Sequence, residues 1–97
     1  MIRHRNAKII ATVGPATASP EGIRGLIDAG AQVFRLNFSH GAHDDHRRVY
    51  RTIRAAEDEQ GRPLAVLADL QGPKFRVGSF ADGSVELDDG AAFRFDL

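Results

Sequence analysis

The segment at residues 35–41 carries polar side chains that burial in an apolar core does not explain. It reads Arg-Leu-Asn-Phe-Ser-His-Gly. Because side chains alternate along a β-strand, the apolar residues at 34, 36 and 38 share one face. The other face carries a guanidinium, an amide and a hydroxyl, from Arg35, Asn37 and Ser39. Burying such groups without partners costs roughly 2–7 kcal/mol for each neutral one. The row is therefore either solvated or part of a site, and we favour the site.

Asp69 is the second chemical signal. It directly follows the uncharged run Leu-Ala-Val-Leu-Ala at residues 64–68. An isolated carboxylate at the end of a buried strand tends to become neutral, so a charged one needs a cation. The candidates are Arg35, Lys74 and a metal ion. A plain salt bridge from Arg35 to Asp69 between neighbouring strands is one reading, and it is compatible with a site.

The types of these residues indicate an anionic ligand with cations nearby. The planar fork of Arg35 suits phosphate or carboxylate. The oxygens of Asn37, Ser39 and Asp69 suit a hard cation. Three histidines at 40, 43 and 46 also permit a zinc site. We favour a helix start for that segment, because Asp44 and Asp45 suit the positive end of a helix.

Three strands and two helices must position these groups. The apolar runs 8–13, 32–38 and 64–68 predict the strands. Ser19 followed by proline and glutamate predicts the start of a helix that ends at Gly30. A second helix is expected over about 44–60, with its packing face formed by His46, Val49, Tyr50 and Ile53.

Strands joined by helical crossovers are parallel, and parallel sheets are usually covered on both faces. Their carboxyl ends meet at one edge, where ligands bind in β/α proteins. Residues 1–74 are therefore expected to be α/β, forming three β/α units of a larger sheet; a closed β/α barrel would need roughly 250 residues.

The pattern changes near residue 75. Asp-Gly pairs at 82–83 and 89–90 are turn signals, and apolar residues alternate with charged ones at 85–88 and 93–97. We expect antiparallel strands that begin, but do not complete, a second domain at residues 75–97. The alternative is a complete small α+β domain whose hairpins cover the sheet.

Composition narrows the class of protein. The 97 residues carry 13 basic and 13 acidic side chains, so nothing suggests binding to nucleic acid or an anionic membrane surface. No apolar stretch approaches the ~20 residues of a membrane span, and the first residues lack the apolar region of a signal peptide. There is no cysteine, which excludes disulfides and thiolate metal sites and fits a cytoplasmic enzyme.

Three segments together resemble one enzyme family. Residues 8–16 read Lys-Ile-Ile-Ala-Thr-Val-Gly-Pro-Ala, residues 37–41 read Asn-Phe-Ser-His-Gly, and residues 69–76 read Asp-Leu-Gln-Gly-Pro-Lys-Phe-Arg. In order, spacing and strand-end position they resemble the N-terminal part of pyruvate kinase. The resemblance implies a TIM barrel with a small β-barrel domain inserted after the third strand. It also implies phosphoryl transfer from phosphoenolpyruvate to ADP in glycolysis, giving pyruvate and ATP.

The resemblance also implies roles for individual residues. The position of Arg35 contacts the transferred phosphoryl group, and positions 37–40 (Asn37, Ser39 and His40 among them) and Arg76 lie near the nucleotide. In many members Asn37, Ser39, Asp69 and the carbonyl of Leu70 correspond to the ligands of a potassium ion. The catalytic lysine and the acidic Mg²⁺ ligands of the family lie downstream, outside this chain. The full-length enzyme is expected to be a homo-oligomer, and the chain alone is expected to be inactive.

The chain departs from the commonest family pattern after Asp69. Many members continue Thr-Lys-Gly-Pro-Glu, whereas this chain has Leu-Gln-Gly-Pro-Lys at residues 70–74. The change resembles the branch that works without potassium. Our hypothesis is that the Lys74 ammonium replaces the ion; the alternative is an exposed Lys74 with potassium still bound. Two other functions stay open: a phosphoenolpyruvate- or pyruvate-handling lyase on a similar barrel, and a non-catalytic module that binds a phosphometabolite.

Overall fold

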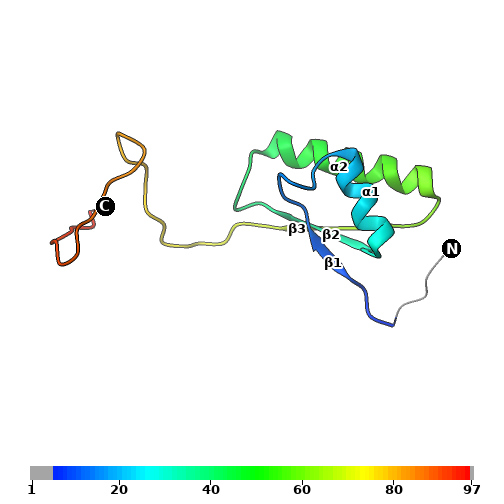
Figure 1. Ribbon diagram of the computed structural model, residues 1–97, viewed down its shortest axis with the longest axis horizontal. Coiled ribbons are helices and arrows are strands. Elements are labelled where there is room, and N and C mark those ends of the chain that lie inside the picture. The colour runs from blue at the N-terminus through cyan, green and yellow to red at the C-terminus, as the bar shows by residue number, and fades with distance from the viewer. Residues whose placement is uncertain (1–5, 97) are drawn as a thin grey trace.

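The computed structural model describes residues 6–96. Five elements follow one another along the chain (Figure 1). They are β1 (Ile10–Thr12), α1 (Pro20–Ala29), β2 (Val33–Asn37), α2 (His43–Gln60) and β3 (Ala65–Asp69). The predicted alternation of strands and helices is confirmed. The third β/α unit is represented by its strand alone, because no helix follows β3 in the described residues.

The three strands form one parallel sheet in the order β1-β2-β3. Paired residues of parallel strands point to the same face, so the register defines two rows of side chains. Thr12, Arg35 and Leu67 are in register and share one face. Asn37 and Asp69 are in register one step further along the same face. The polar residues singled out in the sequence therefore lie on a single face, toward the carboxyl ends of the strands.

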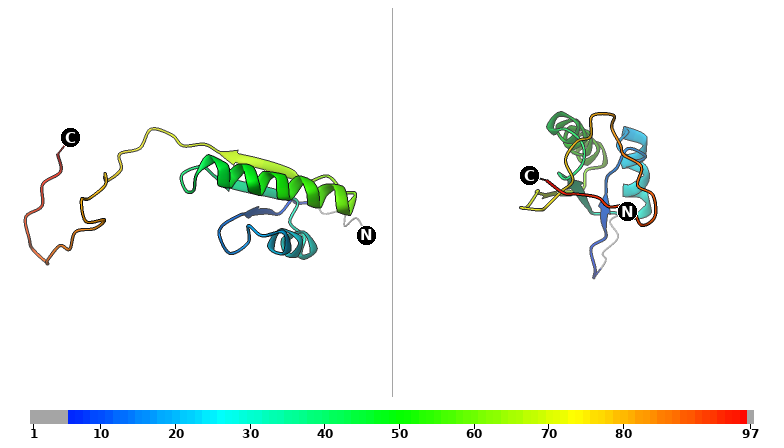
Figure 2. Two further views of the ribbon diagram at one scale, coloured as in Figure 1. Left: turned by 90° about the horizontal axis from the view of Figure 1, so that it is seen from above. Right: turned by 90° about the vertical axis from the view of Figure 1, so that its left-hand side faces the viewer.

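Both helices lie against the opposite face, as the views from above and from the side show (Figure 2). Phe34 and Leu36 of β2 point into this layer and are buried. They meet apolar side chains of both helices and of the residues just before β2 and β3 in a single core cluster: Ile23, Ile27, Ala31, Ile53, Ala56 and Leu64. Covering one face of the sheet in this way gives these short strands most of their buried apolar surface.

The ends of the helices follow the predicted signals. The Ser19 hydroxyl accepts a hydrogen bond from the Gly22 N–H at 3.0 Å, and Pro20 is the first residue of α1. Gly30 ends that helix with φ of 111°, a left-handed conformation that glycine adopts without steric cost. At α2 the Asp45 carboxylate accepts from the Ala42 N–H at 3.1 Å, so this acid caps the helix start as expected.

The prediction is wrong for one residue of the packing face of α2. Tyr50 is exposed, and the Arg54 guanidinium lies 5.1 Å from the centre of its ring. The buried stripe runs instead through Ile53 and Ala56, with Val49 partly buried at its edge. At about 100° per residue, Val49 and Ala56 lie on one side of Ile53 around the helix, whereas Tyr50 lies about 60° to the other side. The buried stripe is therefore centred between Ile53 and Ala56, and Tyr50 falls outside it.

The second face of the sheet is not covered in the described residues. Ile10 and Leu67, which lie on it, are 56% and 41% exposed. The expected cover of this face is therefore not supplied by residues 6–96. The row that contains Arg35 is accessible from outside the sheet.

Residues 70–96 form no helix or strand and extend away from the β/α layers (Figure 1). The two turns are present: Gly83 and Gly90 both have φ of 79°, and each turn is closed by a backbone hydrogen bond of 3.0 Å. The antiparallel strands expected at 85–88 and 93–97 do not form in the described residues, and Leu97 lies outside them. The alternating residues find no partner strand here, and an isolated pair of strands is marginal in water. The alternative in which hairpins cover the sheet is wrong for the same residues.

Candidate functional site at the carboxyl ends of the strands

Arg35 connects all three strands at this edge of the sheet. Its Nε donates to Asp69 Oδ2 at 3.0 Å, and its Nη2 contacts the same oxygen. Its Nη1 donates to the hydroxyl of Thr12 at 3.2 Å. The sequence predicted that Arg35 and Asp69 meet, and the structure brings them together as an ion pair. The sequence analysis did not predict that Thr12 contacts Arg35. The signal that could have indicated this contact is the position of Thr12 as the last residue of β1.

The ion pair is only partly withdrawn from water. The side chains of Arg35 and Asp69 are 31% and 46% exposed. A guanidinium has five N–H donors, and Asp69 and Thr12 together use three of them. The other two donors have no partner among residues 6–96, and the orientation of the cation is already fixed. This arrangement suits the capture of an oxyanion at the strand ends.

The chain turns immediately after β2. The Asn37 side-chain oxygen accepts from the Ser39 N–H at 3.1 Å, and the Asn37 carbonyl accepts from the His40 N–H at 3.2 Å. The Phe38 N–H donates to the Asp69 carbonyl at 3.0 Å, which continues the β2–β3 pairing to the edge of the sheet. Asn37 therefore has a local structural role in shaping this turn.

The oxygens predicted to bind a hard cation lie at the ends of β2 and β3. The chemistry of the set fits such an ion, yet Asn37 Oδ1 and Asp69 Oδ2 already accept hydrogen bonds. Leu70, whose carbonyl completes the predicted set, is 72% exposed. Across residues 6–96 no group of three or more histidine, aspartate or glutamate side chains is placed to hold a metal ion. The histidines at 40, 43 and 46 form no such group in this part of the chain.

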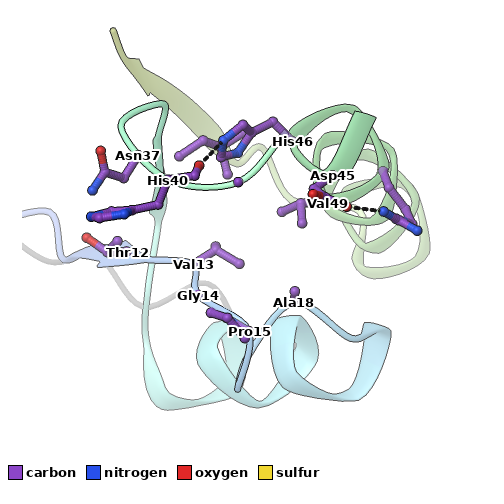
Figure 3. Close-up of a pocket in the computed structure, with 13 residues that line it drawn as sticks. Thr12, Val13, Gly14, Pro15, Ala18, Asn37, His40, Asp45, His46 and Val49 are labelled. Atoms are coloured by element: carbon purple, nitrogen blue, oxygen red, sulfur yellow. Dashed lines mark hydrogen bonds and ion pairs between the residues drawn. The ribbon is translucent and has the colours of Figure 1, made fainter. Parts of the chain in front are cut away.

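A cavity of about 690 Å³ opens beside this cluster, on the side of the helices (Figure 3). The loop after β1, the end of β2 and the first turns of α2 enclose it. Its lining residues are Thr12, Val13, Gly14, Pro15, Ala18, Leu36, Asn37, His40, Gly41, Asp45, His46, Arg48 and Val49. Of the predicted site residues, Asn37 and His40 line it, whereas Arg35 and Asp69 lie outside it. The sequence analysis did not predict most of the residues that line this cavity. Gly14 and Pro15 did indicate that a loop follows β1.

Lys74 and Arg76 are not part of the cluster. Both are exposed, and neither forms an ion pair or side-chain hydrogen bond with another described residue. They follow β3 in the extended segment, where no packing fixes their direction. The cation that pairs with Asp69 in this structure is Arg35 rather than Lys74.

None of the helices in the described residues combines the length and the apolar composition that crossing a membrane requires. A parallel β/α sheet with a held arginine at its carboxyl edge is typical of β/α proteins that bind anionic ligands there. The chain belongs to the pyruvate kinase family. The family model described as pyruvate kinase, barrel domain, matches residues 4–97.

Relatives named pyruvate kinase are similar over nearly the whole chain. One from Agrobacterium vitis is 54% identical over 94 residues, which cover 97% of this chain and 20% of the relative. One from Mycobacterium tuberculosis H37Rv is 49% identical over 90 residues, or 93% of this chain and 19% of the relative. Pyruvate kinase 2 of Synechocystis is 54% identical over 88 residues, or 89% of this chain and 15% of the relative. The chain thus spans about one fifth of the length of the first two.

Proposed function

We propose that the full-length protein containing this chain transfers a phosphoryl group from phosphoenolpyruvate to ADP, giving pyruvate and ATP. The family membership supports the reaction class. The observation that carries the proposal is the Arg35 guanidinium, which Asp69 and Thr12 hold at the strand ends while two of its donors find no partner in the described part of the chain. Phosphoryl transfer depends on in-line positioning and charge neutralisation rather than on covalent chemistry by the protein.

In this proposal Arg35 binds the phosphoryl group during transfer. Its orientation is set before the ligand arrives, because Asp69 and Thr12 already fix the plane of the guanidinium. A preorganised donor of this kind stabilises developing charge without reorganising during the reaction. Asn37, Ser39, His40 and Arg76 are assigned to the nucleotide, and the cavity lined by Asn37 and His40 supplies space for it.

Metal ions are assigned in the same proposal. Mg²⁺, when bound, neutralises phosphate charge, and its ligands lie outside this chain. Asn37, Ser39, Asp69 and the Leu70 carbonyl form the potassium-type position. We propose that the Lys74 ammonium supplies the monovalent charge there, so that potassium is not required. The support is the lysine at a position where many members carry glutamate; in the described structure Lys74 is exposed.

The remaining parts of the proposal concern the whole protein. Residues 1–74 belong to the barrel domain, and residues 75–97 begin an inserted β-domain whose strands form only when the rest of that domain is present. The full-length protein is a cytoplasmic homo-oligomer. The 97-residue chain alone is inactive, because the catalytic lysine and the Mg²⁺ ligands are elsewhere.

A coupled assay of pyruvate formation tests the proposal. The full-length protein is incubated with phosphoenolpyruvate, ADP and Mg²⁺, and pyruvate is measured beside the isolated chain as control. We expect turnover by the full-length protein and none by the chain. Binding of phosphoenolpyruvate without turnover would favour the non-catalytic module, and release of inorganic phosphate or carbon–carbon cleavage without ATP would favour a lyase or hydrolase.

A further inference from the structure

His46 makes a specific contact that the proposed function does not use. This residue lies in the first turn of α2 and is half-buried. Its Nε2 lies 2.7 Å from the backbone carbonyl oxygen of His40, as the dashed line in Figure 3 shows. A carbonyl oxygen only accepts hydrogen bonds, so Nε2 carries the hydrogen and donates. The contact joins the helix to the turn that follows β2.

The imidazole is also held through one of its faces. It stacks on the ring of Phe38, with ring centres 4.4 Å apart and an angle of 22° between the planes. His43 meets the same phenyl ring edge-on, with centres 6.0 Å apart. Stacked and edge-to-face aromatic contacts of this kind restrict the direction of a ring. The Nε2–H of His46 is therefore aimed at the His40 carbonyl and is not a freely rotating donor.

The backbone of the turn passes close to this ring. Gly41 adopts φ of 76°, and a Cβ atom added to it would lie 3.6 Å from His46 Nε2. The Asp45 carboxylate holds the next residue by accepting from the Ala42 N–H at 3.1 Å. Residues 40–42 are thus fixed by two neighbouring side chains of α2, His46 and Asp45.

These contacts form one wall of the cavity. His40, Gly41, Asp45 and His46 all line it, together with Asn37 at the end of β2 (Figure 3). The His40 carbonyl points at His46. The backbone conformation at His40, and with it the position of the His40 side chain, therefore depends on that hydrogen bond. Removal of the donor would leave the His40 carbonyl to water and remove the contact that ties the turn to α2.

We propose that His46 is a positioning residue for the nucleotide: by donating to the His40 carbonyl, it fixes the turn that presents Asn37 and His40 to the cavity. The inference rests on the proposed function, which places the nucleotide in this cavity. It goes beyond that function by assigning His46 an effect on one substrate and not on the other.

Two substitutions in the full-length protein separate the donor from the ring. His46→Phe keeps an aromatic ring for Phe38 and removes the N–H. His46→Gln keeps an N–H at similar reach and removes the ring. Tyr50→Phe, on the exposed side of the same helix, is the matched control. Steady-state kinetics give KM for ADP, KM for phosphoenolpyruvate and kcat.

We expect His46→Phe to raise KM for ADP roughly five- to tenfold, as loss of one hydrogen bond predicts. KM for phosphoenolpyruvate and kcat should stay within about twofold, and His46→Gln should restore most of the affinity for ADP. An unchanged KM for ADP in His46→Phe overturns the inference. So does an equal rise of both KM values, because a purely structural role would affect both substrates.

Amide hydrogen exchange gives a readout independent of activity. In His46→Phe the amides of His40 and Ala42, which are bonded to Asn37 and Asp45, should exchange at least about tenfold faster than in the unsubstituted protein. Unchanged exchange overturns the positioning role whatever the reaction is. If the unsubstituted protein shows no phosphoryl transfer, the proposed function fails, and the exchange result then reports on the turn alone.

Discussion

Arg35 pairs with the carboxylate of Asp69, although Asp69 lies beside Asn37 in the strand register and Arg35 lies beside Leu67. The guanidinium therefore reaches diagonally toward the carboxyl ends of the strands. Its Nε–Oδ2 distance to Asp69 is 3.0 Å, and its other arm reaches the Thr12 hydroxyl at 3.2 Å. This diagonal pairing places the cation at the edge of the sheet where β/α proteins bind their ligands.

Replacement of Arg35 by lysine should impair phosphoryl transfer. Lysine keeps the charge but loses the planar fork, so it cannot hold Asp69 and an oxyanion at the same time. We expect kcat/KM for phosphoenolpyruvate to fall by about 10²-fold in the full-length protein, measured by pyruvate formation. A fall of less than about threefold would contradict the role assigned to Arg35.

Arg24→Lys is the matched control for that substitution. Arg24 donates to Glu59 through Nε and Nη2 at 3.1 and 2.8 Å, so it also forms a forked pair, but between the two helices. The hydrogen bond with Glu59 raises the pKa of Arg24, which stays charged at any working pH. Because this pair is exposed and far from the strand ends, we expect activity to be unchanged.

Lys74→Glu should create a requirement for potassium. The substitution changes the local charge by two units and restores the acid found at this position in many members of the family. We expect the unsubstituted full-length protein to turn over equally in potassium-free and potassium-containing buffer, and Lys74→Glu to need the ion. Lys8→Glu, at the other end of the sheet, is the charge-matched control. Loss of activity by the unsubstituted protein without potassium would refute the hypothesis.

Two glycines of α1 should respond oppositely to alanine. A Cβ atom at Gly22 would lie 2.7 Å from the Thr17 backbone oxygen, whereas one at Gly25 meets nothing within 4 Å. Gly25→Ala should therefore stabilise the protein by about 0.5–1 kcal/mol through helix propensity. Gly22→Ala should destabilise it, because the clash is with backbone that must move. Urea-unfolding midpoints measure both, and a stabilised Gly22→Ala protein would mean that the loop yields without cost.

Ile53 should be the most sensitive position of α2. Its side chain is fully buried between the helix and the sheet, where it belongs to the core cluster. Ile53→Ala should lower the free energy of unfolding by about 2–5 kcal/mol, and Ile53→Val by about 0.5–1.5 kcal/mol, because the cavity grows with each carbon removed. Urea unfolding measures both changes. Equal losses of stability in the two variants would contradict the prediction, because they would show that the core relaxes to fill the cavity.

Several features could be predicted from local signals alone. Ser19 with its following proline marked the start of α1, and Gly30 marked its end. Each signal acts within one turn of the chain, so its effect on the helix end does not depend on tertiary packing. The turns at Gly83 and Gly90 were predictable for the same reason. The strands around them were not, because a strand forms only with a partner, and alternation of side chains does not supply one.

The order of the elements, the parallel class of the sheet and the polar face of β2 were determined by the amino-acid sequence, because periodicity and capping act over a few residues. Tertiary structure alone decided which cation pairs with Asp69 and that Thr12 joins the pair. It also decided that His46 reaches back to His40 to close one wall of a cavity. Those contacts depend on strand register and on the rotation of α2 over the sheet, and both are set by how Phe34, Leu36 and Ile53 pack together.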